Sequence, residues 1–184
     1  MIDDPWKIHT IRSPHRTKSV AARIVGDCVE VRVPEGLAPE RERELVDRLV
    51  KRLKGRIART EMIGDDDLMR RAQHLNRLYF QGTLQITSVR FVTNQQSRYG
   101  SCTTNTGTIR LSDRLAGMPE WVRDYVLVHE LAHLLQPNHS PDFWKLVGRF
   151  PLAERARGYL MACGMNPDVE TSELSGCLGG WVPA

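Results

Sequence analysis

The chain has 184 residues, of which 41% are hydrophobic and 26% are charged, and its formal net charge is +4. This composition is typical of a folded domain and excludes wholesale disorder and low-complexity architectures. No apolar run reaches the roughly 18 residues that a membrane span needs, and the first residues lack the basic start and apolar stretch of a secretory signal. The four cysteines are far apart and form no CxxC pair. We therefore expect reduced thiols, a cytoplasmic location and no membrane partner.

The first third of the chain is basic. Residues 1–60 contain 14 Lys and Arg against 9 Asp and Glu, whereas the remaining residues are nearly balanced. A basic segment of this kind is typical of a solvated helix face, and it is also compatible with a nucleic-acid partner. Both interpretations stay open at this point.

Two elements are predicted in the basic segment. Valines that alternate with other residues at 29, 31 and 33, after the turn residues Gly26 and Asp27, predict a β-hairpin over residues 19–33. Leucines that recur every fourth residue among charged ones predict a long helix over 39–59. A run of aspartates then offers an N-cap for a further helix over 65–80.

The rest of the chain predicts two strands followed by helices. Residues 84–92 and 106–112 are rich in β-branched residues, and the second segment is expected at an edge of its sheet, with a polar loop between the two. Helices are predicted over 119–136, from Pro141 onward behind a Ser140 cap, and over 152–162. This order predicts an α+β fold. We expect one domain over 1–164, made of the hairpin and helix at 1–60 and a catalytic core at about 65–164, and an irregular tail at 165–184.

One motif carries chemistry: His129-Glu130-Leu131-Ala132-His133, an HExxH sequence inside a predicted helix. Histidines four residues apart share a helix face, so both imidazoles can bind one metal ion. Glu130 lies about 100° further round the helix, where it can take a proton from water at the metal. Two imidazoles and a carboxylate base favour Zn²⁺. The apolar neighbours predict a buried helix, in which these polar groups would be costly without a metal partner.

Two residues compete as the third metal ligand. His139 follows just after Pro137, where the chain can turn back, and it directly precedes the Ser140 cap. Glu154 lies on a later helix, as the third ligand does in thermolysin-like enzymes. We favour His139, because its position is fixed by two well-defined helix ends, whereas Glu154 is also explained as a first-turn charge.

Several segments together have the order and spacing of one known family: residues 98–102 (RYGSC), 108–111 (TIRL), 125–133 (YVLVHELAH) and 138–144 (NHSPDFW). They resemble the YgjP-like metallopeptidase family, whose members are metal-dependent hydrolases similar to SprT-like proteins and other zincins. The resemblance implies a zincin-like fold with an N-terminal β-hairpin, a small sheet and an active-site HExxH helix. It also implies that His129, His133 and His139 bind zinc and that Glu130 is catalytic.

Arg98 and Tyr99 are candidate substrate-binding residues. They lie in the polar loop before residues 106–112, where they could contact substrate or a developing oxyanion, although a loop arginine and a packing tyrosine explain them equally well. The family usually has Trp where this chain has Tyr99.

The sequence favours a zinc-dependent peptidase that acts on a peptide or protein lying along residues 106–112 as an added strand. Two alternatives stay open. One is a metal-dependent hydrolase of a phosphorylated or nucleotide substrate, because HExxH defines the metal and the base but not the bond that is broken. The other is a nucleic-acid-binding module with a structural metal.

Overall fold

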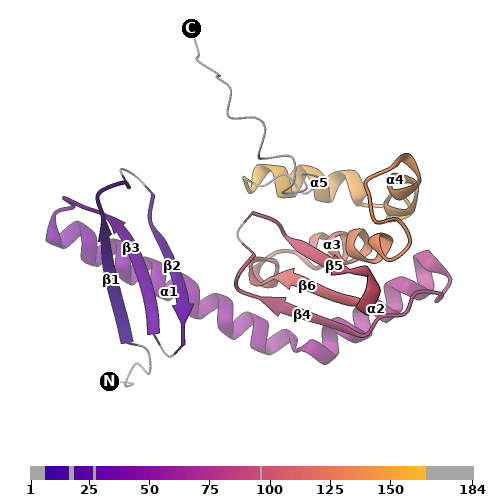
Figure 1. The fold of residues 1–184 in the computed structure, drawn as a ribbon, viewed down its shortest axis with the longest axis horizontal. Coiled ribbons are helices and arrows are strands. Elements are labelled where there is room, and N and C mark those ends of the chain that lie inside the picture. The colour runs from indigo at the N-terminus through magenta and orange to yellow at the C-terminus, as the bar shows by residue number, and fades with distance from the viewer. Residues whose placement is uncertain (1–6, 17–18, 27, 96, 165–184) are drawn as a thin grey trace, which may run out of the picture. The chain divides into compact units, whose positions relative to one another are not determined.

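A computed structural model describes residues 7–16, 19–26, 28–95 and 97–164. The chain divides into two compact units, Met1–Met62 and Ile63–Ala184 (Figure 1). This division lies close to the internal boundary expected from the sequence, between residues 60 and 65. That both units act as one domain stays a prediction, and the expected irregular tail at 165–184 lies outside the described residues.

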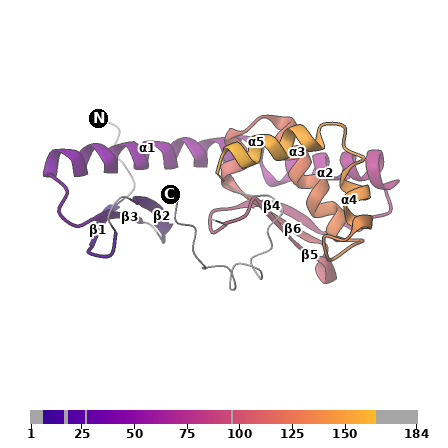
Figure 2. The same ribbon diagram turned by 90° about the horizontal axis from the view of Figure 1, so that it is seen from above.

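The first unit is a three-stranded sheet with one long helix. Its strands are β1 (Lys7–Ser13), β2 (Ala21–Val25) and β3 (Cys28–Pro34), and its helix is α1 (Pro39–Ile63). The central strand β3 pairs in parallel with β1 and antiparallel with β2. Figure 2 shows α1 running beside this sheet.

The core of the first unit forms because β3 alternates. Its valines are buried in every second position and pack with apolar residues of α1: Val29, Val31, Val33, Val46, Val50 and Leu53. The predicted hairpin is therefore confirmed, with Gly26 at a positive φ in its turn. Strand β1 was not predicted, because its residues are mostly exposed and show no apolar alternation.

The second unit contains a small sheet of three strands. These are β4 (Ser88–Val92), β5 (Gly100–Thr103) and β6 (Thr108–Ser112), in the order β4-β6-β5. Strand β6 is central, parallel to β4 and antiparallel to β5. The expectation that residues 106–112 form an edge strand is therefore wrong. The polar loop predicted before it contains β5, which shields one side of β6.

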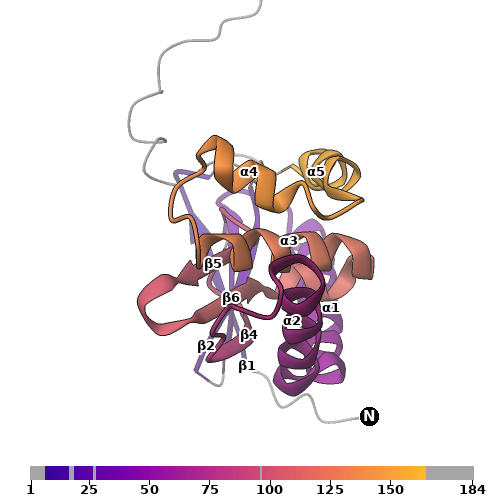
Figure 3. The ribbon, with the colours of Figure 1, turned by 90° about the vertical axis from the view of Figure 1, so that its right-hand side faces the viewer.

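The second unit also contains four helices: α2 (Asp65–Phe80), α3 (Glu120–His133), α4 (Pro141–Val147) and α5 (Ala153–Ala162). Helix α3 is central, because it contacts the sheet through β5 and β6 and also packs against α2, α4 and α5. Figure 3 shows α3 between the sheet and the pair α4 and α5. Ten of its fourteen residues are buried, which agrees with its apolar sequence.

The predicted helices are confirmed with small changes at their ends. Helix α2 has the predicted bounds, but its N-cap is Gly64, and no side chain caps it. The three aspartates occupy the first turn instead, where their charge still favours the helix dipole. Ser140 caps α4 as predicted, since its Oγ accepts a hydrogen bond from the Phe143 N–H at 3.3 Å.

The α+β prediction is confirmed by these elements. Among the described residues, no helix is long and apolar enough to cross a membrane.

Candidate active site

The HExxH motif forms the last part of α3, in the centre of the second unit. His129 and Glu130 are only 6% and 5% exposed, although both carry polar side chains. Burial of such groups costs several kcal/mol unless partners compensate for lost water. Because α3 is buried, the polar side chains of the motif need a binding partner that compensates for the lost water.

Three imidazoles meet at this point. The Nε2 atoms of His129 and His139 are 3.1 Å apart, and one nitrogen from each of His129, His133 and His139 lies within 4.8 Å of the others. Two nitrogens bound to one tetrahedral Zn²⁺ at ~2.05 Å are separated by about 3.3 Å. The geometry of the histidines therefore fits a shared metal ion.

The turn between α3 and α4 presents the third imidazole. Helix α3 ends at His133, and α4 begins at Pro141 behind its Ser140 cap. Within the turn, Nδ1 of His133 and the carbonyl oxygen of Gln136 are 3.1 Å apart. If Nδ1–H donates to this carbonyl, Nε2 is left as the metal-binding atom, as is usual for histidine ligands.

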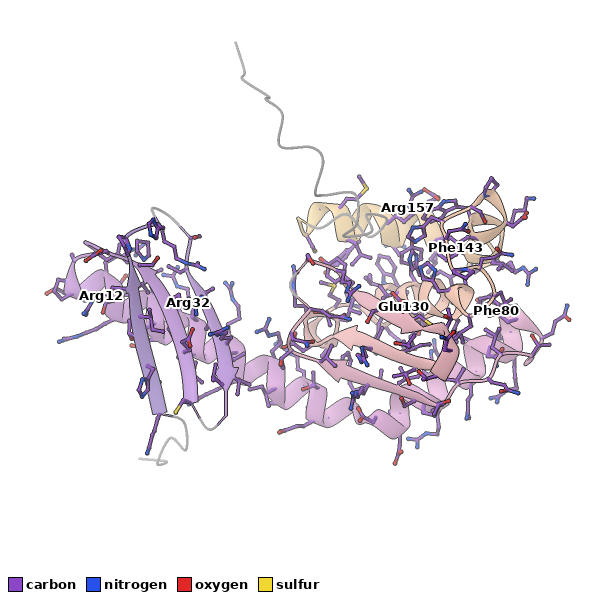
Figure 4. All side chains as sticks on the ribbon, in the orientation of Figure 1. Arg12, Arg32, Phe80, Glu130, Phe143 and Arg157 are labelled. Carbon is purple, nitrogen blue, oxygen red and sulfur yellow. The ribbon has the colours of Figure 1, made fainter. Side chains whose placement is uncertain are left out.

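Two aromatic side chains of α4 pack against the three imidazole rings. The ring of Phe143 is fully buried and lies 4.9, 4.5 and 4.7 Å from the ring centroids of His129, His133 and His139. Trp144 stacks on His139 at 5.5 Å with an interplanar angle of 21°. Figure 4 shows Phe143 on α4 and Glu130 on α3. Packing from α4 thus restricts the orientation of every candidate ligand.

Burial controls the charge states at the site. Burial lowers the pKa of His129 well below its usual value, and the neighbouring His133 and His139 lower it further. A neutral imidazole is the form that binds a metal ion. Burial also raises the pKa of Glu130 to about 8, an effect that the positive charge of Arg98 opposes. A carboxyl group in this range can both accept and release a proton near neutral pH.

The edge strand β5 passes beside Glu130. Its Gly100 approaches the Glu130 carboxylate, and its outer edge is unpaired among the described strands. An added peptide strand can pair only with a free edge. The expectation that substrate lies along residues 106–112 is therefore wrong, because β6 is already paired on both sides.

The structure also separates the competing residues. Glu154 does not belong to the histidine cluster, since its side chain is 84% exposed and accepts hydrogen bonds from Arg157 at 3.1 and 3.2 Å. Tyr99 is 3% exposed, with the Arg114 guanidinium 5.0 Å from its ring centroid, as expected for a packing residue. Arg98 is exposed at the end of the loop before β5. A substrate-binding role for Arg98 and Tyr99 stays a prediction.

Sequence reasoning missed three contributors to the site. The backbone carbonyl of Gln136 and the ring of Phe143 act on the histidines, and Gly100 provides space for Glu130. Phe143 and Gly100 each lie inside a segment that resembles the known family, which was the one signal for them in the sequence. Gly100 acts through a tertiary contact with Glu130, and Gln136 acts through a local contact with His133, three residues away. Neither contact leaves a pattern in a single sequence.

Comparison with known proteins agrees with this geometry. A family model described as YgjP-like, metallopeptidase domain matches residues 72–161. The match places residues 72–161 in a YgjP-like metallopeptidase domain. The YgjP-like domain runs from within α2 to within α5, and it includes the whole sheet and all three histidines of the cluster. The second unit thus carries the domain of a metal-dependent peptidase.

The chain was also compared with solved structures and with curated proteins. The chain is similar to the crystal structure of the metallopeptidase zymogen of Pyrococcus abyssi abylysin, with 23% identity and a TM-score of 0.48. The match covers 55% of this chain and 98% of that one. No curated protein matches the chain.

Proposed function

We propose that this protein is a zinc-dependent peptidase in which His129, His133 and His139 hold the metal and Glu130 is the general base. The observation that supports this most directly is the meeting of three imidazole nitrogens within 4.8 Å beside a buried carboxylate. Three neutral nitrogen ligands with one position left open are typical of catalytic zinc, whereas structural zinc has four protein ligands.

The chemistry divides between the metal and the chain. A bound Zn²⁺ would acidify water and polarise the scissile carbonyl group. Glu130 takes the proton of the attacking water and then delivers it to the nitrogen of the leaving amine. Burial of Glu130 favours this second step, because a raised pKa makes the protonated carboxyl group accessible near neutral pH.

The substrate we propose is a peptide or an unfolded protein segment in extended form. Strand β5 offers its free edge next to Glu130, so the backbone of an added strand can hydrogen-bond there. This pairing would position the scissile bond without requiring a particular side chain at each position.

Metal analysis and two variants test the proposal. We expect about one zinc per chain in protein purified without chelators or tags. Glu130→Gln should keep this zinc and lose peptide cleavage by at least about 10²-fold, because the ligands remain and the base is gone. His129→Ala should lose the zinc. An inactive His129→Ala that retains a full equivalent of zinc would contradict the ligand assignment.

The same preparation separates the alternatives. Nucleoside triphosphates and a casein-type peptide mixture should be offered side by side, with release of phosphate and of free amines as the two readouts. Release of phosphate alone would favour the phosphorylated or nucleotide substrate. A steep salt dependence of DNA or RNA binding would favour a nucleic-acid partner for residues 1–60. The cytoplasmic location expected from the sequence stays a prediction.

A further inference from the structure

A polar hollow of about 380 Å³ lies on the second unit, outside the histidine cluster. Its lining contains Arg90, Arg98 and Arg110 together with amide and hydroxyl side chains, and it contains no acidic residue. All three arginines are exposed, and no ion pair joins them to a carboxylate in the described part of the chain. By contrast, Arg71 is bound to Asp124 in the same unit.

The sheet register forces two of these charges together. Arg90 on β4 is the direct partner of Arg110 on β6, and Arg110 is the direct partner of Ser101 on β5. Like charges in directly opposed positions of a sheet are destabilising unless an anion lies between them. Val89 and Ile109, the preceding residues on the two strands, are buried on the opposite face. The arginines therefore form a positive patch on the outer face of the sheet.

One of the side chains that line this hollow is polar and buried. Gln95 is 7% exposed, its Nε2 donates to Ser101 Oγ at 2.6 Å, and its backbone carbonyl accepts a hydrogen bond from Ser112 Oγ at 3.2 Å. Its Oε1 is buried and has no hydrogen-bond partner among the described residues. Because an unsatisfied buried amide oxygen is costly and can only accept a hydrogen bond, a donor such as water is expected beside it. The guanidinium groups, and not this oxygen, are what attracts an anion to the hollow.

The hollow and the catalytic carboxylate lie on opposite faces of one edge strand. Gly100 faces Glu130, whereas its neighbour Ser101 faces the hollow. Successive side chains of an extended strand point to opposite faces of the sheet. In a peptide paired with β5, one set of side chains would therefore face α3, and the alternate set would reach the arginines.

We propose that the hollow lined by Arg90, Arg98, Arg110 and Gln95 is a subsite for an acidic side chain of the peptide substrate. This inference rests on the proposed function for the location of the peptide. A carboxylate matches the three guanidinium groups, because arginine binds carboxylates through paired charge-assisted hydrogen bonds. The subsite would make cleavage selective for Asp or Glu at one position of the substrate.

The test compares pairs of peptides that differ only in whether one side chain ends in a carboxylate or in an uncharged amide. A set of labelled Ala- and Gly-rich peptides carries Glu at one position in turn, and each has a matched peptide with Gln there. We expect kcat/KM to favour Glu over Gln by about 10-fold or more at a single position, as a charged hydrogen bond commonly contributes. Arg110→Gln should reduce this ratio below about twofold, and Arg110→Glu should favour Lys at the same position.

Arg77→Gln is the matched control. Arg77 is an exposed arginine in the last turn of α2, outside the hollow, so this variant changes net charge equally and should keep the preference for Glu. Unfolding curves of each variant show whether it is folded. If Arg110→Gln and Arg77→Gln keep the same Glu-to-Gln ratio as the unchanged protein, the subsite is contradicted.

Binding to Glu130→Gln separates this inference from the proposed function. Fluorescence anisotropy reports binding of the Glu and Gln peptides without cleavage. Binding to Glu130→Gln that depends on Glu and on Arg110, together with no peptide cleavage by the unchanged protein, would support the subsite and contradict the peptidase. Cleavage without any Glu preference would contradict only the subsite. Displacement of the Glu peptide by micromolar pyrophosphate would also overturn the inference, in favour of a phosphate ligand.

Discussion

Gly100 on β5 and Glu130 on α3 approach so closely that no side chain fits between them. A Cβ atom built on Gly100 would lie 2.2 Å from Glu130 Oε1 and 2.7 Å from its Cδ. The backbone of Gly100 has no positive φ, so this position requires glycine for space and not for conformation. The edge strand can thus pass directly beside the proposed general base.

Gly100→Ala should therefore displace Glu130. We expect kcat for peptide cleavage to fall by about 10²-fold, because misplacement of a catalytic group by about 1 Å costs that much. Zinc content should not change, since the three atoms nearest to the added Cβ all belong to Glu130 and none to a proposed ligand. Gly158→Ala is the control, as its added Cβ meets nothing within 4 Å. Full activity in Gly100→Ala would show that Glu130 is free to move.

Phe143→Leu should weaken metal binding. The ring of Phe143 contacts all three candidate ligands, and a smaller side chain would let them rotate. We expect a loss of about 10-fold in zinc affinity, in the range found when outer groups that orient ligands are changed. Competition with a fluorescent chelator measures this affinity.

Phe150→Leu is the matched control for that variant. Phe150 belongs to the same core and packs against Tyr79 and Tyr125, but no ring contact joins it to the histidine cluster. Both variants should lose similar stability, since each removes part of a buried aromatic ring. Equal zinc affinities in the two would argue against an orienting role for Phe143.

Asp124→Asn should destabilise the second unit by about 2 kcal/mol, because it breaks a largely buried ion pair. The Asp124 side chain is 6% exposed and accepts a hydrogen bond from Arg71 Nε at 2.8 Å. Asp142→Asn is the comparison, as the Asp142–Lys145 pair is exposed and should contribute less than about 1 kcal/mol. Urea unfolding followed by tryptophan fluorescence measures both. Similar effects would mean that burial does not strengthen the Asp124 pair.

Cys102 should react slowly with iodoacetamide. Burial, together with the nearby charge of Glu130, raises the pKa of its thiol to about 12, so almost no thiolate forms at pH 8. Cys163 is exposed and should be alkylated much faster. Peptide mapping by mass spectrometry after timed labelling compares the two. Labelling of Cys102 at the rate of Cys163 would contradict the buried environment.

The helices and the three-histidine cluster were predictable because local signals define them. Helix α2 has the bounds predicted from its flanking glycines and acidic start. The histidine spacing in α3 and the two helix ends around His139 indicated the cluster that the structure shows. These features depend on residues near one another in the chain.

The strands and the residues that surround the histidine cluster were less predictable, because most of their contacts are with residues far away in the sequence. Strand β5 is four residues long and has no apolar alternation, so its identity comes from pairing with β6. The same pairing makes β6 central and brings Arg90 beside Arg110. A single sequence does not record which strands are neighbours.

His139 lies beyond the end of α3, just before the short helix α4. The position of this proposed metal ligand therefore depends on the stability of α4. Two of the proposed ligands are carried by α3, whereas the third is held by the turn that α4 anchors through Ser140 and Phe143. Any opening that detaches α4 would remove one of the three nitrogens at once. Ion uptake would consequently act as a staple across the turn, and amide hydrogens in residues 141–147 should exchange more slowly in the loaded protein.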